Sequence, residues 1–396
     1  MKLVKIKDVI LNKISGEWGE EADESNSTPV IRTANFRNNG KVDFDNLVFR
    51  NIPTHKINAK RLIDGDVIIE KSGGSPTQPV GRVVFFANSF GKTFLCNNFT
   101  SILRPDKELV FPEFLFYVLF YNHKMGKTLR FQNKTTGIIN LQLDKYLESE
   151  IPLPSLAEQI QIATVLSKAE DLIAKRKEGI ELLDEFVKST FLEMFGDPVR
   201  NEKGWDKKTL KSFGQIITGN TPPRGDLENY SDNFIEWIKT DNIISSETYI
   251  SKASEYLSEK GLKKARTVTV GALLVACIAG SVESIGRSAI ADRTVSFNQQ
   301  INAIQPSNEV NSLFLYWLFK ISKYYIQNQA TKGMKKILTK GIFEKIIMIK
   351  PPTKLQNQFA EIANKVEVLK AKYQKSLEEL ENLYGSLSQR AFRGEL

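Results

Sequence analysis

The chain contains the same long helical pattern twice. Residues 162–195 form an amphipathic helix pattern, and residues 359–392 repeat it 197 positions later. Six apolar positions coincide without a gap: Ile162 with Phe359, Val165 with Ile362, Leu172 with Leu369, Ile180 with Leu377, Leu183 with Leu380, and Phe195 with Phe392. This match indicates an internal duplication, and it constrains how the 396 residues can fold.

Within each copy, apolar residues recur at spacings of three and four, which is the heptad pattern of helices that pack along a seam. We predict that the seam contains Leu166, Ala169, Ile173, Ile180, Leu183, Val187, Val366, Leu377, Leu380 and Leu387. A helix of about 35 to 40 residues reaches roughly 55 Å at 1.5 Å per residue, which is too long for an ordinary domain to enclose. The two helices must therefore pack on each other or on a partner.

The segments that precede the helices also correspond, with an offset that drifts from about 207 to 196 as loop lengths change. Residues 32–36 match residues 239–243, residues 65–69 match 271–275, and an aromatic helix pattern at 114–119 matches 314–319. Each segment shows strand patterns first and a helix later. We expect four parts: a first unit at 1–150, a helical region at 151–198, a second unit at 199–348 and a C-terminal helical region at 349–396.

These patterns predict an α+β fold with two mixed α/β units. The first helix leads from unit to unit, and the second begins at the second unit. If the two helices pack together, they must be antiparallel. We therefore expect a pseudo-twofold arrangement in which the two units are separated by a coiled-coil spacer.

The net charge of +9 is concentrated in the expected globular units. Residues 1–150 carry 21 Lys and Arg against 17 Asp and Glu, and residues 199–348 carry 21 against 14. The two helical regions carry 5 against 9 and 8 against 6. Basic units favour a polyanionic partner such as nucleic acid, although a surplus of this size could equally serve solubility alone.

Composition excludes several other classes of protein. Two cysteines rule out a disulfide framework, and two histidines without paired-cysteine spacing make a zinc site improbable. The N-terminus lacks a signal-peptide hydrophobic stretch, and no apolar run approaches the roughly 20 residues needed to span a bilayer. We expect a cytoplasmic protein with no membrane partner.

Motifs for catalysis are also missing from the sequence. The double prolines, Pro222-Pro223 and Pro351-Pro352, lack the Asn or Asp and the aromatic residue of an adenine methyltransferase motif. Gly91-Lys92-Thr93 resembles the end of a phosphate-binding loop, but Phe86 stands where its first glycine should be. We expect no catalytic residue, no metal site and no cofactor in this chain.

Two similar but non-identical basic units at a fixed distance would read two different half-sites on one duplex. Several stretches of the chain match one known family. They are Leu153-Pro154-Ser155-Leu156-Ala157-Glu158-Gln159-Ile160, Phe191-Leu192-Glu193-Met194-Phe195-Gly196-Asp197-Pro198, Trp205, and the stretch from Leu383-Tyr384 to Phe392, with weaker matches at Thr218-Gly219-Asn220-Thr221-Pro222 and Trp237-Ile238-Lys239. Over its whole length the chain resembles the specificity subunits of type I restriction-modification systems.

This resemblance implies two target recognition domains and two helical spacers that read a bipartite, asymmetric sequence in double-stranded DNA. It also implies two methylation subunits and restriction subunits as partners, which would hold S-adenosylmethionine and, for restriction, ATP and Mg. The first unit departs from the family pattern, because residues 17–27 lack the Thr-Gly-x-Thr-Pro opening.

Base reading requires paired hydrogen bonds from Arg, Lys, Asn or Gln side chains, and Gly/Ser-rich loops allow the backbone to approach phosphates. Positions that are polar in both units, together with such loops, give the DNA-contact candidates Arg32, Thr33, Asn35, Lys71, Ser72, Arg82, Asn97, Lys134, Arg224, Lys239, Thr240, Asn242, Arg287, Asn298, Lys332 and Lys335. The alternative is that shared residues build the common fold, because residues that give two half-sites their identity should differ. The outer helix faces are candidate docking surfaces for methylation subunits, or simply solvated charged faces.

Two other functions remain open at this stage. The same architecture could serve as a two-headed scaffold that binds proteins or glycans instead of DNA. The chain could also be an enzyme in its own right, despite the missing motifs.

Overall fold

A computed structural model describes residues 2–75, 77–87, 91–135, 138–331, 336–393 and 395, without the side chains at 26, 134, 135 and 282. The chain divides into two compact units. Unit 1 contains Met1–Arg176 and Ser376–Leu396, and unit 2 contains Lys177–Lys375. Each compact unit therefore includes part of each long helix, in contrast to the separate helical regions expected at 151–198 and 349–396.

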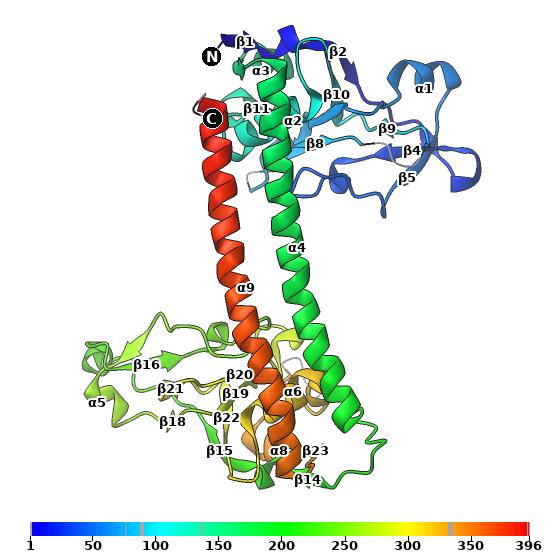
Figure 1. Ribbon diagram of the computed structural model, residues 1–396. Coiled ribbons are helices and arrows are strands. Elements are labelled where there is room, and N and C mark those ends of the chain that lie inside the picture. Colours follow the sequence, from blue (N-terminus) through cyan, green and yellow to red (C-terminus); the bar gives the residue numbers. More distant parts are fainter. Residues whose placement is uncertain are drawn as a thin grey trace. The chain divides into compact units, whose positions relative to one another are not determined.

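The main sheet of unit 1 has four antiparallel strands in the order β2, β10, β6 and β8 (Figure 1). Their bounds are Ile10–Ser15, Thr100–Pro105, Val67–Glu70 and Val83–Phe85. The strand β6 is buried along its whole length. Helix α2 (Pro112–Lys124) contacts this sheet, and its aromatic residues share a core with Val67, Val83 and Leu103.

A second four-stranded sheet and two smaller sheets complete unit 1. They contain β3 (Glu20–Glu21), β5 (Val48–Asn51), β4 (Thr28–Ile31) and β9 (Leu95–Cys96); β11 (Gln132–Thr135), β12 (Ile138–Leu141) and β7 (Ser72–Gly74); and β1 (Lys2–Lys5) with β13 (Glu150–Leu153). The short helices are α1 (Thr54–Lys60) and α3 (Leu143–Leu147). All strand pairs in these sheets are antiparallel except β4 with β9.

Unit 2 repeats this plan. Its main sheet has the order β15 (Gly214–Thr218), β22 (Ile301–Pro306), β19 (Leu273–Ala276) and β20 (Ser288–Ile290). The other strands are β17 (Tyr256–Leu257), β16 (Ile235–Ile238), β21 (Val295–Phe297) and β18 (Thr267–Val268), with β14 (Lys207–Thr209) paired to β23 (Ile347–Ile349). The helices are α5 (Glu259–Leu262), α6 (Ser312–Ile321), α7 (Lys323–Asn328) and α8 (Lys340–Lys345).

Strand register shows which positions of the two units are equivalent. In unit 1, Ser101 of β10 pairs with Ser15 and with Ile69. In unit 2, Asn302 of β22 pairs with Thr218 and Val275 in the same way. The expected duplication and the mixed α and β composition are therefore confirmed.

The helices α4 (Leu156–Phe195) and α9 (Thr353–Arg393) are antiparallel within each unit. In unit 1, the hydroxyl of Tyr384 on α9 hydrogen-bonds Glu170 on α4, and the core joins Ile162 to Ala391. In unit 2, Lys370 on α9 binds Asp184 on α4 at 2.8 Å. In unit 1, residues later in α4 thus contact residues earlier in α9, which is the order expected of antiparallel helices.

The ten predicted seam residues all lie on covered helix faces. Leu166, Ala169, Val187, Val366 and Leu377 are buried, and Ile173, Ile180, Leu183, Leu380 and Leu387 are half-buried. Some repeated apolar residues lie outside the seam, because Leu172 and its counterpart Leu369 are 53% and 39% exposed. No described helix is long and apolar enough to cross a membrane.

A buried glutamine fixes the start of each long helix. The side chain of Gln159 donates to the carbonyls of Leu109 and Pro154 and accepts from the backbone N–H of Phe111. Gln356 makes the equivalent bonds to Glu309, Pro351 and Asn311. Because one side chain pairs with three backbone groups, each glutamine joins its long helix to the loop before α2 or α6.

Candidate nucleic-acid interface

The first pair of DNA-contact candidates lies in a turn that both units share. In unit 1 this turn is η3 (Thr33–Asn35), where Asn35 Oδ1 accepts a 2.9 Å hydrogen bond from the backbone N–H of Arg32. In unit 2 it is η7 (Thr240–Asn242), where Asn242 accepts a 3.0 Å bond from Lys239.

Asn35 is fully buried, and its amide nitrogen donates to the carbonyls of Asp43 and Asn46. Asn242 is half-buried and bonds Ser251 and Lys252 in the same manner. Both asparagines therefore close a turn of the fold, which explains why the two units share them. Because Asn35 is buried, it is no longer a candidate for DNA contact.

The arginine pair clamps the same turn. Arg82 donates to the Thr33 carbonyl at 3.1 Å, and Arg287 donates to the Thr240 carbonyl at 3.4 Å. Arg82 also donates two 2.9 Å bonds to the buried carboxylate of Glu70, so its charge is compensated inside the unit.

The two arginines differ in whether a carboxylate neutralises the guanidinium charge. Glu70 and Ala276 are equivalent, since their backbone N–H groups donate to the carbonyls of Arg82 and Arg287 respectively. Arg287 consequently makes no ion pair with any carboxylate in the described part of the chain. Its buried Nε also has no hydrogen-bond partner there. Arg287 is a better candidate for an external anion than Arg82.

The third shared pair, Asn97 and Asn298, lies at a close crossing of two chain segments. Both are 5% exposed. A side-chain carbon built on Gly16 would lie 2.0 Å from the Asn97 carbonyl oxygen, and one on Gly219 would lie 2.1 Å from that of Asn298. Only glycine permits this approach. The sequence alone did not pair these glycines, which follow the equivalent strands β2 and β15.

The most exposed cationic candidate is Arg224, in the loop after β15. Its guanidinium lies 4.7 Å from the ring centre of Tyr230 and 4.8 Å from that of Trp237, and it forms a 2.8 Å ion pair with Glu255. Lys239 binds the same carboxylate. Hydrogen bonds from Lys239 and then Arg224 hold the pKa of Glu255 below its usual range. Two cations thus share one anion. They lie beside the rings of Tyr230 and Trp237, which we call an aromatic shelf, and the arrangement leaves a net positive charge on a planar hydrogen-bond donor.

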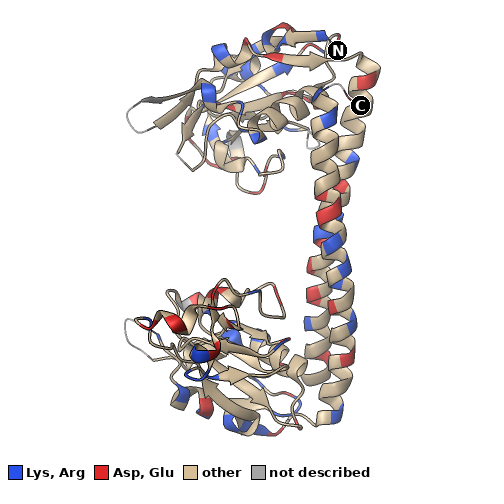
Figure 2. Ribbon diagram, turned by 90° about the vertical axis from the view of Figure 1, so that its left-hand side faces the viewer, with Lys and Arg blue, Asp and Glu red and all other residues tan. Residues whose placement is uncertain are grey.

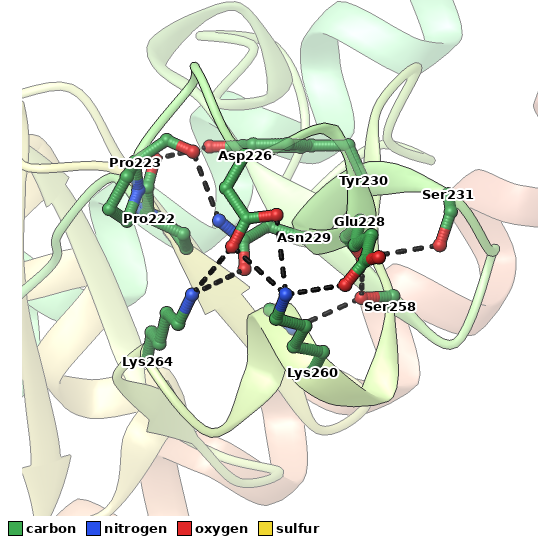
Figure 3. Close-up of polar contacts among 11 residues, drawn as sticks. Pro222, Pro223, Asp226, Glu228, Asn229, Tyr230, Ser231, Ser258, Lys260 and Lys264 are labelled. Atoms are coloured by element: carbon green, nitrogen blue, oxygen red, sulfur yellow. Dashed lines mark hydrogen bonds and ion pairs between the residues drawn. The ribbon is translucent and has the colours of Figure 1, made fainter.

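A polar network braces the loop that carries Arg224 (Figure 3). Lys264 binds Asp226 at 2.9 Å and Asn229 at 3.0 Å, while Lys260 binds Asp226 at 3.1 Å and also Glu228. The amide of Asn229 donates to the Pro223 carbonyl at 3.0 Å. Because the loop is tied to α5 at several points, Arg224 is presented from a fixed backbone.

The motif Gly219-Asn220-Thr221-Pro222 supports the same loop. Asn220 accepts a 2.8 Å bond from the backbone of Arg266, donates to the Lys264 carbonyl at 2.7 Å, and its own carbonyl accepts from the indole of Trp237. Unit 1 lacks this motif. There the guanidinium of Arg50 stacks 3.9 Å from the ring centre of Trp18. Neither aromatic shelf was found from the sequence, because its members lie far apart along the chain.

The remaining candidates are distributed over both units. Thr33 and Thr240 are half-buried, and Ser72 donates its hydroxyl to Asn140. Lys134 lies in β11 without a described side chain, and Lys332 and Lys335 lie outside the described residues. Figure 2 shows Lys and Arg interspersed with Asp and Glu within each unit, so no single-sign face is evident from the ribbon.

Burial shifts the pKa values of both cysteines and of one histidine. Burial raises the pKa of Cys96 to about 11 and that of Cys277 to about 12, so neither is a thiolate near pH 7. Burial lowers the pKa of His123 to about 4. Among the described residues, no group of three His, Cys, Asp or Glu side chains could hold a metal ion.

The fold defines a duplicated α+β protein in which Arg224 of unit 2 and Arg50 of unit 1 each lie beside aromatic rings. The family described as "Type I restriction modification DNA specificity domain" matches the chain twice, at residues 1–182 and 202–382. The chain belongs to this family.

Two relatives of the chain are named as specificity subunits of type I restriction enzymes. The putative type I restriction enzyme MjaX specificity subunit of Methanocaldococcus jannaschii is 22% identical over 95% of this chain and 89% of its own length. The HindI specificity subunit of Haemophilus influenzae is 21% identical over 68% of this chain and 74% of its own length. The crystal structure of the S subunit from M. genitalium superposes with a TM-score of 0.63 at 15% identity, covering 99% of this chain and 96% of that one.

Proposed function

We propose that this chain is the DNA-specificity subunit of a type I restriction-modification complex. In this role its two units read the two halves of a bipartite, asymmetric sequence in double-stranded DNA. The observation that carries the proposal is the double match to a specificity domain, one match for each fold repeat. The net positive charge and the braced Arg224 support it.

The chain would act without chemistry of its own. Methyl transfer from S-adenosylmethionine, and any ATP- and Mg-dependent restriction, would belong to partner subunits. The burial of both cysteines agrees with this assignment. Incubation of the purified chain alone with S-adenosylmethionine and DNA tests it, because methyl transfer in the absence of partners would overturn it.

The first experiment measures binding of the purified chain to DNA at several salt concentrations. A subunit that contacts several phosphates should lose affinity steeply as salt rises, with a slope of about −0.9 per contact. A scaffold for proteins or glycans need not bind DNA. Absence of binding to any duplex, alone or with the methylation subunits, would overturn the proposal.

The second experiment identifies the target by methylome sequencing of the source strain with and without this gene. We expect methylated adenine in a two-part motif with an unspecified gap, and we expect that methylation to disappear when the gene is deleted. Substitution of Arg224 by Ala should relax one half of the motif only, because Arg224 belongs to unit 2. An unchanged set of methylated motifs after deletion would contradict the proposal.

We further propose that partner subunits dock on the outer faces of α4 and α9. Lys175, Lys177, Glu178 and Glu181 lie on exposed positions of α4, and apolar Leu182 and Phe186 are 61% and 53% exposed beside them. Exposed apolar side chains of this size favour a protein partner over solvent. Replacement of Leu182 and Phe186 by Ser should weaken co-purification with the methylation subunits, whereas DNA binding by the chain alone should be retained.

The helices would also set the unread gap between half-sites. Removal of one helical turn from α4 should change the gap in the methylated motif or prevent assembly. Methylation of the original motif at the original spacing would contradict this role of the helix.

A further inference from the structure

Unit 1 contains a basic hollow of about 540 Å³ around Lys71, which is one of the DNA-contact candidates. It lies between the main sheet and α3. The lining residues belong to β2, β10, β12 and α3, or lie directly after β6 or before α3. The lining residues are Lys13, Ser15, Lys71, Ser101, Leu141, Gln142, Leu143, Asp144 and Lys145.

Lys71 is the central cation of this hollow. Its ammonium is half-buried and donates a 2.5 Å hydrogen bond to the hydroxyl of Ser15. It forms no ion pair with a carboxylate of the described residues. Burial lowers the pKa of Lys71, and the positive charges of Lys60 and Lys13 act in the same direction. The described residues therefore provide no carboxylate counter-ion for this half-buried ammonium.

The other charges nearby do not compensate it. Lys60 binds Glu17 at 2.8 Å, and Lys13 binds Asp144 at the rim, where the Asp144 side chain is 84% exposed. Lys145 is exposed. Around the hollow, three lysines therefore face one carboxylate, and that carboxylate already has a partner.

Unit 2 shows what the fold requires at the same positions. Leu141 donates its backbone N–H to the Lys71 carbonyl, and Leu338 donates to the Cys277 carbonyl, so Lys71 and Cys277 are equivalent. Strand register also makes Lys13 equivalent to Ile216. Leu103 of β10 pairs with Lys13 on one side and Val67 on the other. Ile304 of β22 pairs with Ile216 and Leu273 in the same way.

In unit 2 the residues equivalent to Lys71, Lys13, Ser15 and Ser101 are Cys277, Ile216, Thr218 and Asn302, and none of them is charged. Cys277 is buried, and the side chain of Asn302 bonds Thr218 at 2.6 Å and the Leu338 carbonyl at 3.1 Å. The fold is therefore compatible with neutral residues at the positions of Lys71 and Lys13. The lysines of unit 1 must serve something other than the shared architecture.

We propose that this hollow binds one phosphate group of the DNA backbone, with the ammonium of Lys71 and the hydroxyls of Ser15 and Ser101 as donors and Lys13 as a second cation. A tetrahedral anion with several acceptor oxygens suits one ammonium and adjacent hydroxyls. The inference rests on the proposed DNA-binding function and adds a backbone anchor that unit 2 lacks. Such an anchor fixes register on the duplex without reading bases.

The test uses the full-length chain with Lys71→Met, Lys71→Arg and a control variant, Lys107→Met. Lys107 is an exposed lysine of unit 1, and its ammonium donates to the Asp64 carbonyl at 3.3 Å. Because Cys277 occupies the equivalent position in unit 2, an apolar residue at position 71 should allow folding, which circular dichroism and thermal melting will verify.

We expect Lys71→Met to reduce the salt dependence of DNA binding by about 0.9 in the slope of log K against log salt. The loss in affinity should be equal for cognate and non-cognate duplexes, since a phosphate contact carries no base information. Lys71→Arg should keep the slope of the wild-type chain, and Lys107→Met should keep both slope and affinity. Inorganic phosphate should raise the melting temperature of the wild-type chain more than that of Lys71→Met.

Three results would overturn the inference. One is an unchanged slope in Lys71→Met while the wild-type chain binds DNA, which would leave the proposed function intact. Another is a loss confined to the cognate duplex, which would make Lys71 a base-reading residue. The last is stabilisation by inorganic phosphate without any change in slope, which would limit the hollow to free anions. If the wild-type chain binds no DNA at all, the proposed function itself fails first.

Discussion

Arg82 donates two 2.9 Å hydrogen bonds to the carboxylate of Glu70, whose side chain is only 3% exposed. The same guanidinium reaches the Thr33 carbonyl of the repeated turn. This pair links β6 to the turn after β4, and so it joins the two larger sheets of unit 1. In unit 2, Arg287 keeps the contact with the turn but has Ala276 in place of the carboxylate.

We predict that Arg82→Ala lowers the free energy of unfolding of unit 1 by about 3 kcal/mol, because it leaves the Glu70 carboxylate buried without its partner. Arg287→Ala is the matched control and should cost unit 2 less than about 1.5 kcal/mol, since only one long hydrogen bond is lost. Hydrogen exchange of peptides from each unit, followed in urea, measures the two changes separately. Equal losses in both variants would contradict a special role for Glu70.

The repeat made much of this fold predictable. Apolar spacing identified α4 and α9, and the aligned segments identified two units of one plan. The long helices follow from local periodicity, which the sequence displays directly. The matched polar residues were less informative about DNA contact. Asn35 and Arg82 are shared with unit 2 because they build the common turn.

The candidate contacts depend on distances that the sequence does not contain. Arg224 is presented by Trp237 and Glu255, which are brought to it by the pairing of β16 with β17. Equivalent backbone hydrogen bonds identify Cys277 as the counterpart of Lys71, and only this comparison shows that the shared fold does not require a lysine there. Residues that distinguish the two units are found by comparison of equivalent positions, and this comparison requires the structure.

A buried glutamine at the start of α4 provides a second prediction. Gln159→Leu removes the partners of the Phe111 N–H and of two carbonyls, at Leu109 and Pro154, while the volume changes little. We expect a loss of about 2–4 kcal/mol in the unfolding free energy of unit 1, because three hydrogen bonds are lost and each contributes about 0.5–1.5 kcal/mol. Gln161→Leu, on the exposed side of the same helix, should change it by less than about 0.5 kcal/mol. A small effect of Gln159→Leu in urea unfolding would show that the loop before α2 needs no such anchor.

The braced loop of unit 2 gives a third prediction. A side-chain carbon on Gly261 of α5 would lie 2.2 Å from the Asn229 carbonyl oxygen, so Gly261→Ala must push the loop away from α5. We expect a loss of about 1–3 kcal/mol in the stability of unit 2, as for overpacked sites. DNA binding should weaken at the half-site that requires Arg224, because the arginine loses its fixed backbone.

Gly225→Ala is the control for this loop, since no atom lies within 4 Å of the added carbon. Its stability and DNA affinity should remain close to those of the wild-type chain. If both alanine variants bind DNA equally well, the position of the loop does not determine recognition by unit 2.

Glu170 on α4 gives a prediction about pH. Its carboxylate accepts hydrogen bonds from the hydroxyls of Tyr117 at 3.0 Å and Tyr384 at 2.8 Å, in unit 1 where α4, α9 and α2 meet. Burial raises the pKa of Glu170 despite these two bonds. Since the folded state holds the proton more tightly than the unfolded state, the stabilising contribution of Glu170 is present below the unfolded pKa and is lost as pH rises through the folded pKa.

The variant Glu170→Gln stays neutral at every pH and can still accept a hydrogen bond from a tyrosine. Relative to the wild-type chain, its unfolding free energy should therefore improve as pH rises from about 4 towards 7, where the wild-type carboxylate is ionised. Urea unfolding of unit 1 at pH 4, 5, 6 and 7 provides the comparison. Parallel stability curves for Glu170→Gln and the wild-type chain would show that the carboxylate titrates alike in both states, and a trend of the opposite sign would mean that the tyrosine hydrogen bonds outweigh the cost of burial.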